Sequence, residues 1–311
     1  MSTHQTTSPS KQNDGSSINS KLVLSIPLEN LASTRANVFV GDKTRSSTAT
    51  SVVLLDPQTL VCCHFNGCKM YLIRFNLAAG TYEIVDSLET TYKGIKCETD
   101  LMGGDGNGNI IVSNFFEHSC TLYRCDGNKL TFVKDLDYSA GNFVHGAKLW
   151  GSNTGCVTTR GQTGGIHFFD IETCKRKFII STPGLGVQDL CILPDQKIVM
   201  IANTGHPSLQ AGETYSAMAM ILERGKDPQK IRTTARATFE KSHFDNVVFN
   251  KGKLFITDQY NNCVLVLDAV NLSTIGSYDN FDFPHGVDAN YDVLATTNYG
   301  KNTVEIRSLD F

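Results

Sequence analysis

Short apolar segments alternate with turn residues along most of the chain. In residues 51–88, the turn signals Asp56-Pro57-Gln58, Asn66-Gly67 and Ala79-Gly80 separate four such segments. Tight turns of this kind join antiparallel neighbours in a sheet. The pattern therefore predicts a four-stranded antiparallel sheet, the blade of a β-propeller, with strands at Ser51–Leu55, Thr59–His64, Cys68–Phe75 and Thr81–Val85.

The same succession recurs along the chain with a period of roughly 40–50 residues, which is typical of propellers. Phe143–Trp150 and Phe283–Asn290 show the repeat plainly, because both place a His-Gly pair at the start of an apolar strand. We therefore predict an all-β fold, a six-bladed β-propeller. The strands expected in the later blades include Asn109–Asn114, Cys120–Cys125, Leu130–Lys134, Gly155–Thr159, Gly165–Asp170, Arg176–Ile180, Lys197–Ala202, Ser216–Glu223, Thr233–Ala237, Lys253–Asp258, Cys263–Asp268, Leu272–Tyr278, Asp292–Thr297 and Thr303–Leu309.

The sixth blade lacks its outer strand when the chain ends. The segment Lys21–Pro27 can supply it, and closure of the ring by an N-terminal strand removes exposed sheet edges. Residues 1–20 are rich in Ser, Thr, Gln and Asn and predict a disordered tail, so residues 21–311 would form a single propeller domain. Residues 28–49, which include the strand-like Asn37–Val40, predict a long crossing loop or an extra hairpin, and a seven-bladed count stays open.

Composition limits the classes of partner. The net charge is −3 and no basic block occurs, which argues against nucleic-acid binding. No apolar run approaches the roughly 18 residues of a membrane span, and the first residues lack the apolar stretch of a signal peptide. We expect a cytoplasmic monomer that binds no membrane. Its ten cysteines would then be free, buried thiols.

Each blade opens with a polar residue at the start of its innermost strand, which we call its ring residue. Such side chains would point into a narrow channel of low dielectric constant. Carboxylates there repel each other and lose solvation unless something compensates. A divalent cation is one solution, and ordered water with His–carboxylate hydrogen bonds is another. The ring residues assigned from the sequence are Thr50, Glu98, His145, Gln188, Asp245 and His285.

The chemistry of these side chains suggests their roles. Oxygen donors on Glu98, Gln188 and Asp245 predict a metal site that favours calcium, with zinc as an alternative because His145 and His285 add nitrogen donors. The innermost strand of each blade starts at one face of the propeller, and the turns between second and third strands would lie at the same face. Most of the histidines belong to this face. A small organic substrate is expected there. Its expected contacts are His64, Phe115, Phe116, His118, Arg160, His206, Tyr260 and Tyr299.

Family resemblance adds a chemical expectation. The segment Asp258–Val266 followed by Phe283–Val287 resembles an NHL-type repeat. The six-bladed layout is similar to the calcium-dependent phosphotriesterase superfamily, which includes the gluconolactonase and senescence-marker proteins. That family places metal ligands at its ring positions, with Asp in the fifth blade and Asn in the fourth. Here Asp245 matches the former, and Gln188 is a near substitute for the latter. His145 and Thr50 depart from the pattern.

This resemblance implies a metal-assisted hydrolase of esters or lactones. A cation on Glu98, Gln188 and Asp245 would polarise the carbonyl, and His145 or His285 would act as general base, so Glu98, His145 and His285 are the expected catalytic residues. The paired His-Gly segments also resemble the zinc-binding segments of the peptidylglycine amidating lyase propeller.

Two further resemblances imply other functions. In size and plan the chain is similar to fungal propellers of natural-product biosynthesis, including hetero-Diels–Alderases. That similarity implies a metal-independent cyclase of secondary metabolism with no cofactor. The NHL-type resemblance alone implies a non-enzymatic propeller that binds a partner protein.

Overall fold

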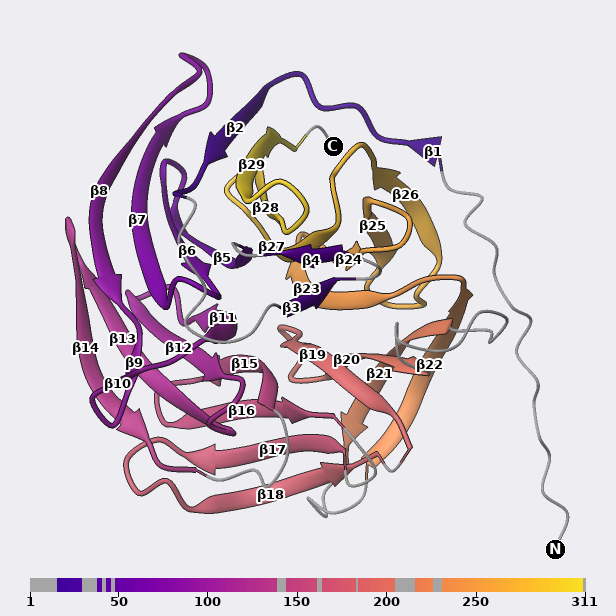
Figure 1. Ribbon diagram of the computed structural model, residues 1–311. Coiled ribbons are helices and arrows are strands. Elements are labelled where there is room, and N and C mark those ends of the chain that lie inside the picture. The colour runs from indigo at the N-terminus through magenta and orange to yellow at the C-terminus, as the bar shows by residue number, and fades with distance from the viewer. Residues whose placement is uncertain are drawn as a thin grey trace, which may run out of the picture.

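The computed structural model is a ring of six small sheets around a common centre (Figure 1), as the sequence predicts. No helix long and apolar enough to cross a membrane occurs among the residues that the structure describes. Those residues are 16–29, 38–40, 43–45, 48–138, 144–160, 164–182, 184–204, 216–225 and 231–309.

Every blade is an antiparallel sheet whose strands follow one another outward from the channel. Blade one contains β5 (Ala49–Asp56), β6 (Thr59–His64), β7 (Lys69–Asn76) and β8 (Thr81–Glu89). Blade two contains β11 (Thr99–Gly104), β12 (Asn109–Asn114), β13 (Ser119–Asp126) and β14 (Lys129–Leu136). Blade three contains β15 (Val144–Trp150), β16 (Thr154–Thr159), β17 (Gly165–Asp170) and β18 (Arg176–Ser181). Blade four contains β19 (Gly186–Ile192), β20 (Ile198–Thr204), β21 (Ser216–Arg224) and β22 (Ile231–Glu240). Blade five contains β23 (Phe244–Asn250), β24 (Lys253–Asp258), β25 (Cys263–Asp268) and β26 (Thr274–Tyr278). Blade six contains β27 (Pro284–Asn290), β28 (Val293–Asn298) and β29 (Thr303–Ser308).

An N-terminal strand completes the sixth blade, which confirms the expected closure. β2 (Val23–Pro27) pairs antiparallel with β29, so that Ile26 lies opposite Val304. Residues 16 and 17, which the sequence analysis assigns to the tail, instead form β1 (Ser16–Ser17), which runs parallel to β26 on blade five. Residues 1–15 lie outside the described part of the chain.

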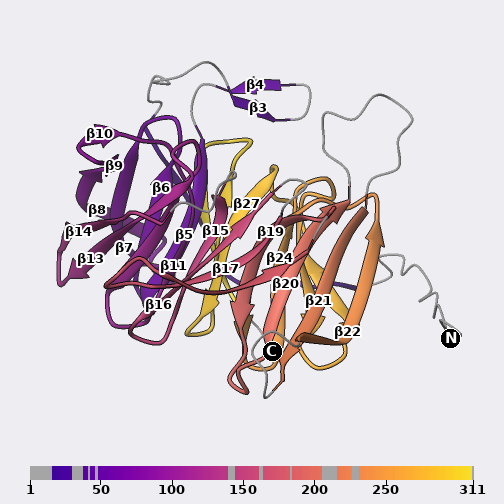
Figure 2. The same ribbon diagram turned by 90° about the horizontal axis from the view of Figure 1, so that it is seen from below.

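Among the described residues, two short hairpins lie outside the blades. β3 (Val38–Val40) pairs with β4 (Lys43–Arg45), so the segment before blade one contains a hairpin and not a seventh blade. In Figure 1 this hairpin overlaps the centre of the ring, and in Figure 2 it stands above one face. It precedes β5 closely in the chain, which identifies that face as the one where the innermost strands begin. β9 (Thr91–Tyr92) and β10 (Ile95–Lys96) form the second hairpin, between blades one and two.

Apolar clusters fill the spaces between neighbouring blades. Between blades six and one, for example, Ile26 and Val304 pack in one cluster with Tyr71 of β7. Strands with a neighbour on both faces are buried throughout, as β6 is, whereas the outer strand β8 is largely exposed. The continuous apolar run Leu60–Cys63 therefore reflects burial of both faces of a sheet.

Four hydroxyl groups join consecutive blades beside the channel. The hydroxyl of Thr158 accepts the N–H of Gly146 in its own blade at 2.7 Å and donates to the carbonyl of Gln188 in the next blade at 2.6 Å. Ser113, Thr257 and Thr297 make equivalent pairs of bonds. Each hydroxyl thus bonds the backbone next to the ring residue of its own blade and the carbonyl of the ring residue in the next blade, so this network fixes the direction of the side chains that enter the channel.

Candidate functional site

A bulge lies at the ring position of all six innermost strands, because the pairing register shifts there. The bulge leaves the side chain of that residue free to enter the channel, and in four blades it is an ionisable residue. These residues are Asp100 (β11), His145 (β15), Asp245 (β23) and His285 (β27). The assignment of Glu98 as the ring residue of blade two is therefore wrong by two positions.

The error has a simple physical origin. Glu98 and Asp100 are both polar and stand two residues apart, and the period of a strand cannot separate two such positions. Glu98 lies immediately before β11, is buried, and uses its carbonyl to accept the N–H of Phe115 at 3.2 Å.

Asp100, His145, Asp245 and His285 meet at the centre of the channel, and we call them the central cluster. The Nε2 atom of His145 lies 3.3 Å from a carboxylate oxygen of Asp100 and 3.5 Å from one of Asp245. The Nε2 atom of His285 lies 3.4 Å from Asp100 and 3.9 Å from Asp245. Two imidazoles thus alternate with two carboxylates, and all four residues are buried.

Backbone carbonyls determine which imidazole nitrogen faces the centre. The Nδ1 atom of His145 lies 2.8 Å from the carbonyl oxygen of Gln188, and that of His285 lies 2.9 Å from the carbonyl oxygen of Thr50. Carbonyl oxygens only accept hydrogen bonds, so Nδ1 carries the proton in both rings. Each ring consequently directs its Nε2 atom toward the carboxylates, an orientation that is also found in histidines that bind metal ions through Nε2.

Arg160 lies beside the central cluster and contacts Asp245. Its Nη2 atom lies 3.5 Å from the Asp245 carboxylate and donates a hydrogen bond to the side-chain oxygen of Gln188. Among these groups two carboxylates face one guanidinium. With neutral imidazoles the set carries an excess of negative charge, which a bound cation would compensate.

Burial changes the acidity of the cluster. Desolvation raises the pKa of Asp100 to about 6, with His285 and Arg160 opposing the rise and the Asp245 carboxylate adding to it. Desolvation also lowers the pKa of His145 well below its usual value, and the nearby positive charges of Arg160 and His285 lower it further. His145 is therefore neutral at pH 7, as metal coordination requires.

The distances in the cluster fit a small metal ion. One nitrogen each from His145 and His285 and one oxygen from Asp100 lie within 4.8 Å of one another. Around a tetrahedral ion with metal–ligand distances near 2.1 Å, ligand atoms stand about 3.4 Å apart. Each imidazole lies at this spacing from one oxygen of Asp100, His145 at 3.3 Å from Oδ2 and His285 at 3.4 Å from Oδ1.

The expected oxygen ligands are only partly brought together. Asp245 joins the central cluster. The Gln188 side chain instead bonds Arg160 and donates to the carbonyl of Gly186 at 3.2 Å. Glu98 does not belong to the group of closely spaced imidazole and carboxylate ligands found among the described residues.

Aromatic residues border the cluster at the face where the innermost strands begin. Tyr299 stacks on His285 with ring centroids 5.2 Å apart. Phe283 contacts both Tyr299 and Tyr260, and Tyr260 meets the ring of His243 edge to face at 5.5 Å. Tyr260 and Tyr299, which the sequence assigns to substrate contacts, therefore lie close to the cluster.

The second aromatic group lies on the side of blades one and two. Phe115 packs against Phe65 and Phe116, and the guanidinium of Arg160 lies 6.0 Å from the Phe115 ring centroid. Phe116 is one of the large apolar side chains that remain exposed. Phe115 and Arg160 thus extend the aromatic border to the charged centre.

Two of the three expected turn histidines lie in the described part of the chain. His64 is fully buried and its Nδ1 accepts the N–H of Gly67 at 3.0 Å, which holds the β6–β7 turn. His118 lies in the β12–β13 turn with a φ of 53°. His206 lies outside the described residues. Of the histidines that the sequence brings to this face, His145, His285 and His243 lie at the centre.

Sequence reasoning missed Asp100, the partner of both ring histidines. A signal for it exists in the chain. In blades two, three, five and six, the residue after the ring residue donates its N–H to a Ser or Thr hydroxyl 11 or 12 positions later. Applied to blade two, this spacing leads from Ser113 back to Leu101, and so to Asp100.

Comparisons with known proteins identify the fold and no more. No protein-family model matches the chain, and no curated protein matches it. A chain of hydrazine synthase from Kuenenia stuttgartiensis is similar in structure, with a TM-score of 0.58 at 12% identity over 84% of this chain and 95% of that chain. The computationally designed protein Ika8 matches with a TM-score of 0.49 at 10% identity, over 86% of this chain and 72% of that chain. At such identities, the hydrazine synthase similarity supports the fold alone.

Proposed function

We propose that this protein is a metal-assisted hydrolase of small esters or lactones, with one divalent ion bound by the central cluster. The observation that carries the proposal is the convergence of the Nε2 atoms of His145 and His285 on the carboxylate of Asp100. Both imidazoles are oriented by backbone carbonyls, and such second contacts position histidine ligands in metal sites.

The donor set argues for zinc and against calcium. Calcium takes six to eight oxygen ligands, whereas two imidazole nitrogens and a carboxylate suit zinc. The ligands we propose are Asp100, His145 and His285, in place of the set with Glu98 and Gln188 expected from the sequence. Three protein ligands leave a tetrahedral ion one position open for a substrate or water.

The neighbouring residues supply the remaining functions of a hydrolase. The bound ion would polarise the substrate carbonyl. Asp245 lies within 3.5 Å of His145 and is not needed as a ligand, so it is placed to accept a proton from the attacking water. Arg160, held between Gln188 and Asp245, would stabilise negative charge that develops on the carbonyl oxygen. Tyr299 and Phe115 would contact the apolar part of the substrate.

Metal analysis with matched variants tests this proposal. The protein is stripped with chelator, reloaded separately with zinc or calcium, and assayed for bound metal and for hydrolysis of a panel of lactones and nitrophenyl esters. We expect stoichiometric zinc in the wild type and in Glu98→Gln, and its loss in Asp100→Asn and His285→Gln. Asp245→Asn should keep zinc and lose hydrolysis.

Two outcomes would overturn the proposal. A correctly folded wild type that binds neither metal would exclude a metal-assisted reaction. Metal retained by Asp100→Asn and His285→Gln but lost in Glu98→Gln would restore the ligand set expected from the sequence.

A metal-independent cyclase is the second candidate, and the acidity of Asp100 favours it. A carboxyl whose pKa is about 6 can donate a proton near neutral pH, and here it lies beneath an aromatic border that could bind a polyene. A metal-free protein in which Asp100→Asn abolishes cyclisation of a polyene substrate would support this alternative. The third function expected from the sequence, partner-protein binding, stays a prediction.

A further inference from the structure

A cavity of about 530 Å³ lies between blades three and four, at the face opposite the central cluster. It is formed by the outer end of the β15–β16 hairpin, by β18, and by turns at the far ends of β20 and β21. We propose that this cavity binds a small aromatic carboxylate, at a site separate from the proposed hydrolase centre. Its volume falls within the range of small-molecule sites. The residues that line it are Trp150, Gly151, Thr154, Lys177, Phe178, Gln196 and Arg224.

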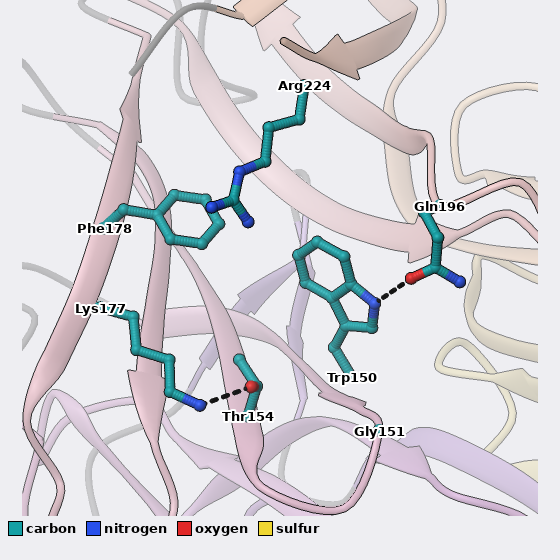
Figure 3. A pocket seen from close by; sticks show the side chains of 7 residues that line it. All are labelled: Trp150, Gly151, Thr154, Lys177, Phe178, Gln196 and Arg224. Atoms are coloured by element: carbon teal, nitrogen blue, oxygen red, sulfur yellow. Dashed lines mark hydrogen bonds between the residues drawn. The ribbon is translucent and has the colours of Figure 1, made fainter. Parts of the chain in front are cut away.

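Aromatic rings form two walls of the cavity (Figure 3). The indole N–H of Trp150 donates to the side-chain oxygen of Gln196 at 2.7 Å, which holds the indole ring in one orientation. Beneath them Phe168 meets Trp150 edge to face at 5.4 Å and stacks on Phe178 at 4.2 Å. These contacts give the cavity preformed aromatic walls, and a flat ring can pack against the indole of Trp150 and edge to face beside Phe178.

Arg224 supplies a positive charge at the cavity. Its guanidinium lies 4.3 Å from the centroid of the Phe178 ring, so the ring holds the charged plane in place (Figure 3). Within the described part of the chain, no ion pair or side-chain hydrogen bond of Arg224 is found. A guanidinium stacked in this way keeps its N–H donors for a carboxylate, which it can bind in bidentate fashion.

Lys177, the other cation at the cavity, is already engaged. Its Nζ atom donates to the hydroxyl of Thr154 at 2.8 Å and lies 3.5 Å from the carboxylate of Asp170. Among the described residues, the cavity therefore offers the Arg224 guanidinium as a positive charge outside any ion pair, beside aromatic walls. A ligand with one carboxylate on an aromatic ring matches both features.

Tryptophan fluorescence makes the proposal testable, because Trp150 is the chain's only tryptophan. The full-length protein is titrated with benzoate, followed by Trp150 fluorescence and by calorimetry. Benzamide serves as the uncharged probe of the same shape, and cyclohexanecarboxylate as the non-aromatic acid. We expect a saturable fluorescence change with benzoate and much weaker responses to the other two.

Two matched variants then locate the charge. Charge-assisted hydrogen bonds contribute roughly 1.5–3 kcal/mol. Arg224→Gln should therefore weaken benzoate binding about tenfold or more. Arg236→Gln removes the same charge from an exposed position on β22 of the same blade and should leave the affinity unchanged.

The opposite results would overturn the proposal. The inference fails if benzoate produces no saturable change in wild-type fluorescence. It also fails if benzamide or cyclohexanecarboxylate binds as tightly as benzoate, since the charge or the aromatic ring would then be irrelevant. If calorimetry gives the same benzoate binding for Arg224→Gln as for the wild type, benzoate binds elsewhere on the protein and the inference fails.

Discussion

Closure of the propeller by β2 can be tested at Ile26. This side chain is completely buried and packs with Leu24, Val304 and Ile306 in the cluster between blades six and one. Ile26→Ala removes three carbon atoms, which costs about 2.4 kcal/mol at roughly 0.8 kcal/mol for each buried methylene. The cavity left behind adds to this loss, and core truncations of this size cost about 2–5 kcal/mol. We expect a decrease of about 3–4 kcal/mol in the free energy of unfolding.

Equilibrium unfolding in urea, followed by circular dichroism and Trp150 fluorescence, measures this loss. Ser25→Ala is the matched control, because Ser25 lies on the same strand with its side chain exposed, and it should change stability by less than about 0.5 kcal/mol. A loss below about 1 kcal/mol for Ile26→Ala would refute the reasoning. It would mean that β2 separates from the ring before the blades unfold.

Three further predictions concern acid stability, thiol reactivity and the contacts between blades. Burial lowers the pKa of both His64 and His167 to about 4, below the value near 6.5 of an unfolded chain, so protons bind preferentially to the unfolded state between these values. The free energy of unfolding should therefore fall as pH drops from about 6.5 to about 4, by up to about 3 kcal/mol for each histidine. In urea titrations at several pH values, His167→Gln should lose less stability over this range than the wild type. An equal loss in both proteins would contradict this account. Every cysteine except Cys174 is buried, so brief alkylation of the native protein followed by mass spectrometry should label Cys174 first, and rapid labelling of several thiols would be inconsistent with the packing. Thr297→Val removes the hydroxyl that links blade six to blade one and should lower the free energy of unfolding in urea by about 1–3 kcal/mol. The control Thr81→Val, on the exposed strand β8, should lower it little. Equal effects would show that the link does not stabilise the ring.

The blade pattern could be predicted because it rests on local information. Strands Asn109–Asn114, Gly165–Asp170, Lys253–Asp258 and Cys263–Asp268 are observed with the expected bounds. Turn residues and apolar runs define such segments within about ten residues of chain. The closing strand was also predictable, because a blade that lacks its outer strand exposes unpaired backbone N–H and C=O groups, which another strand must bond.

The candidate site depended on finer details. Glu98 and Asp100 are equally plausible ring residues in the sequence, and the bulge in β11 decides between them. That bulge depends on the bonds of the Ser113 hydroxyl to Leu101 in its own blade and to His145 in the next blade. A contact between blades is set by packing of the whole ring, which local patterns do not encode.

The sequence by itself determined the class of fold and predicted the face that carries polar chemistry, because a repeated period of strands and turns specifies them, whereas the structure settled six blades against seven. It also showed that the ring histidines His145 and His285 belong to equivalent positions. Only the tertiary structure decided that both direct Nε2 toward Asp100 and that Gln188 bonds Arg160 instead of joining them. The physical reason is that acidity and metal affinity depend on distances between atoms of different blades, and ring closure sets those distances.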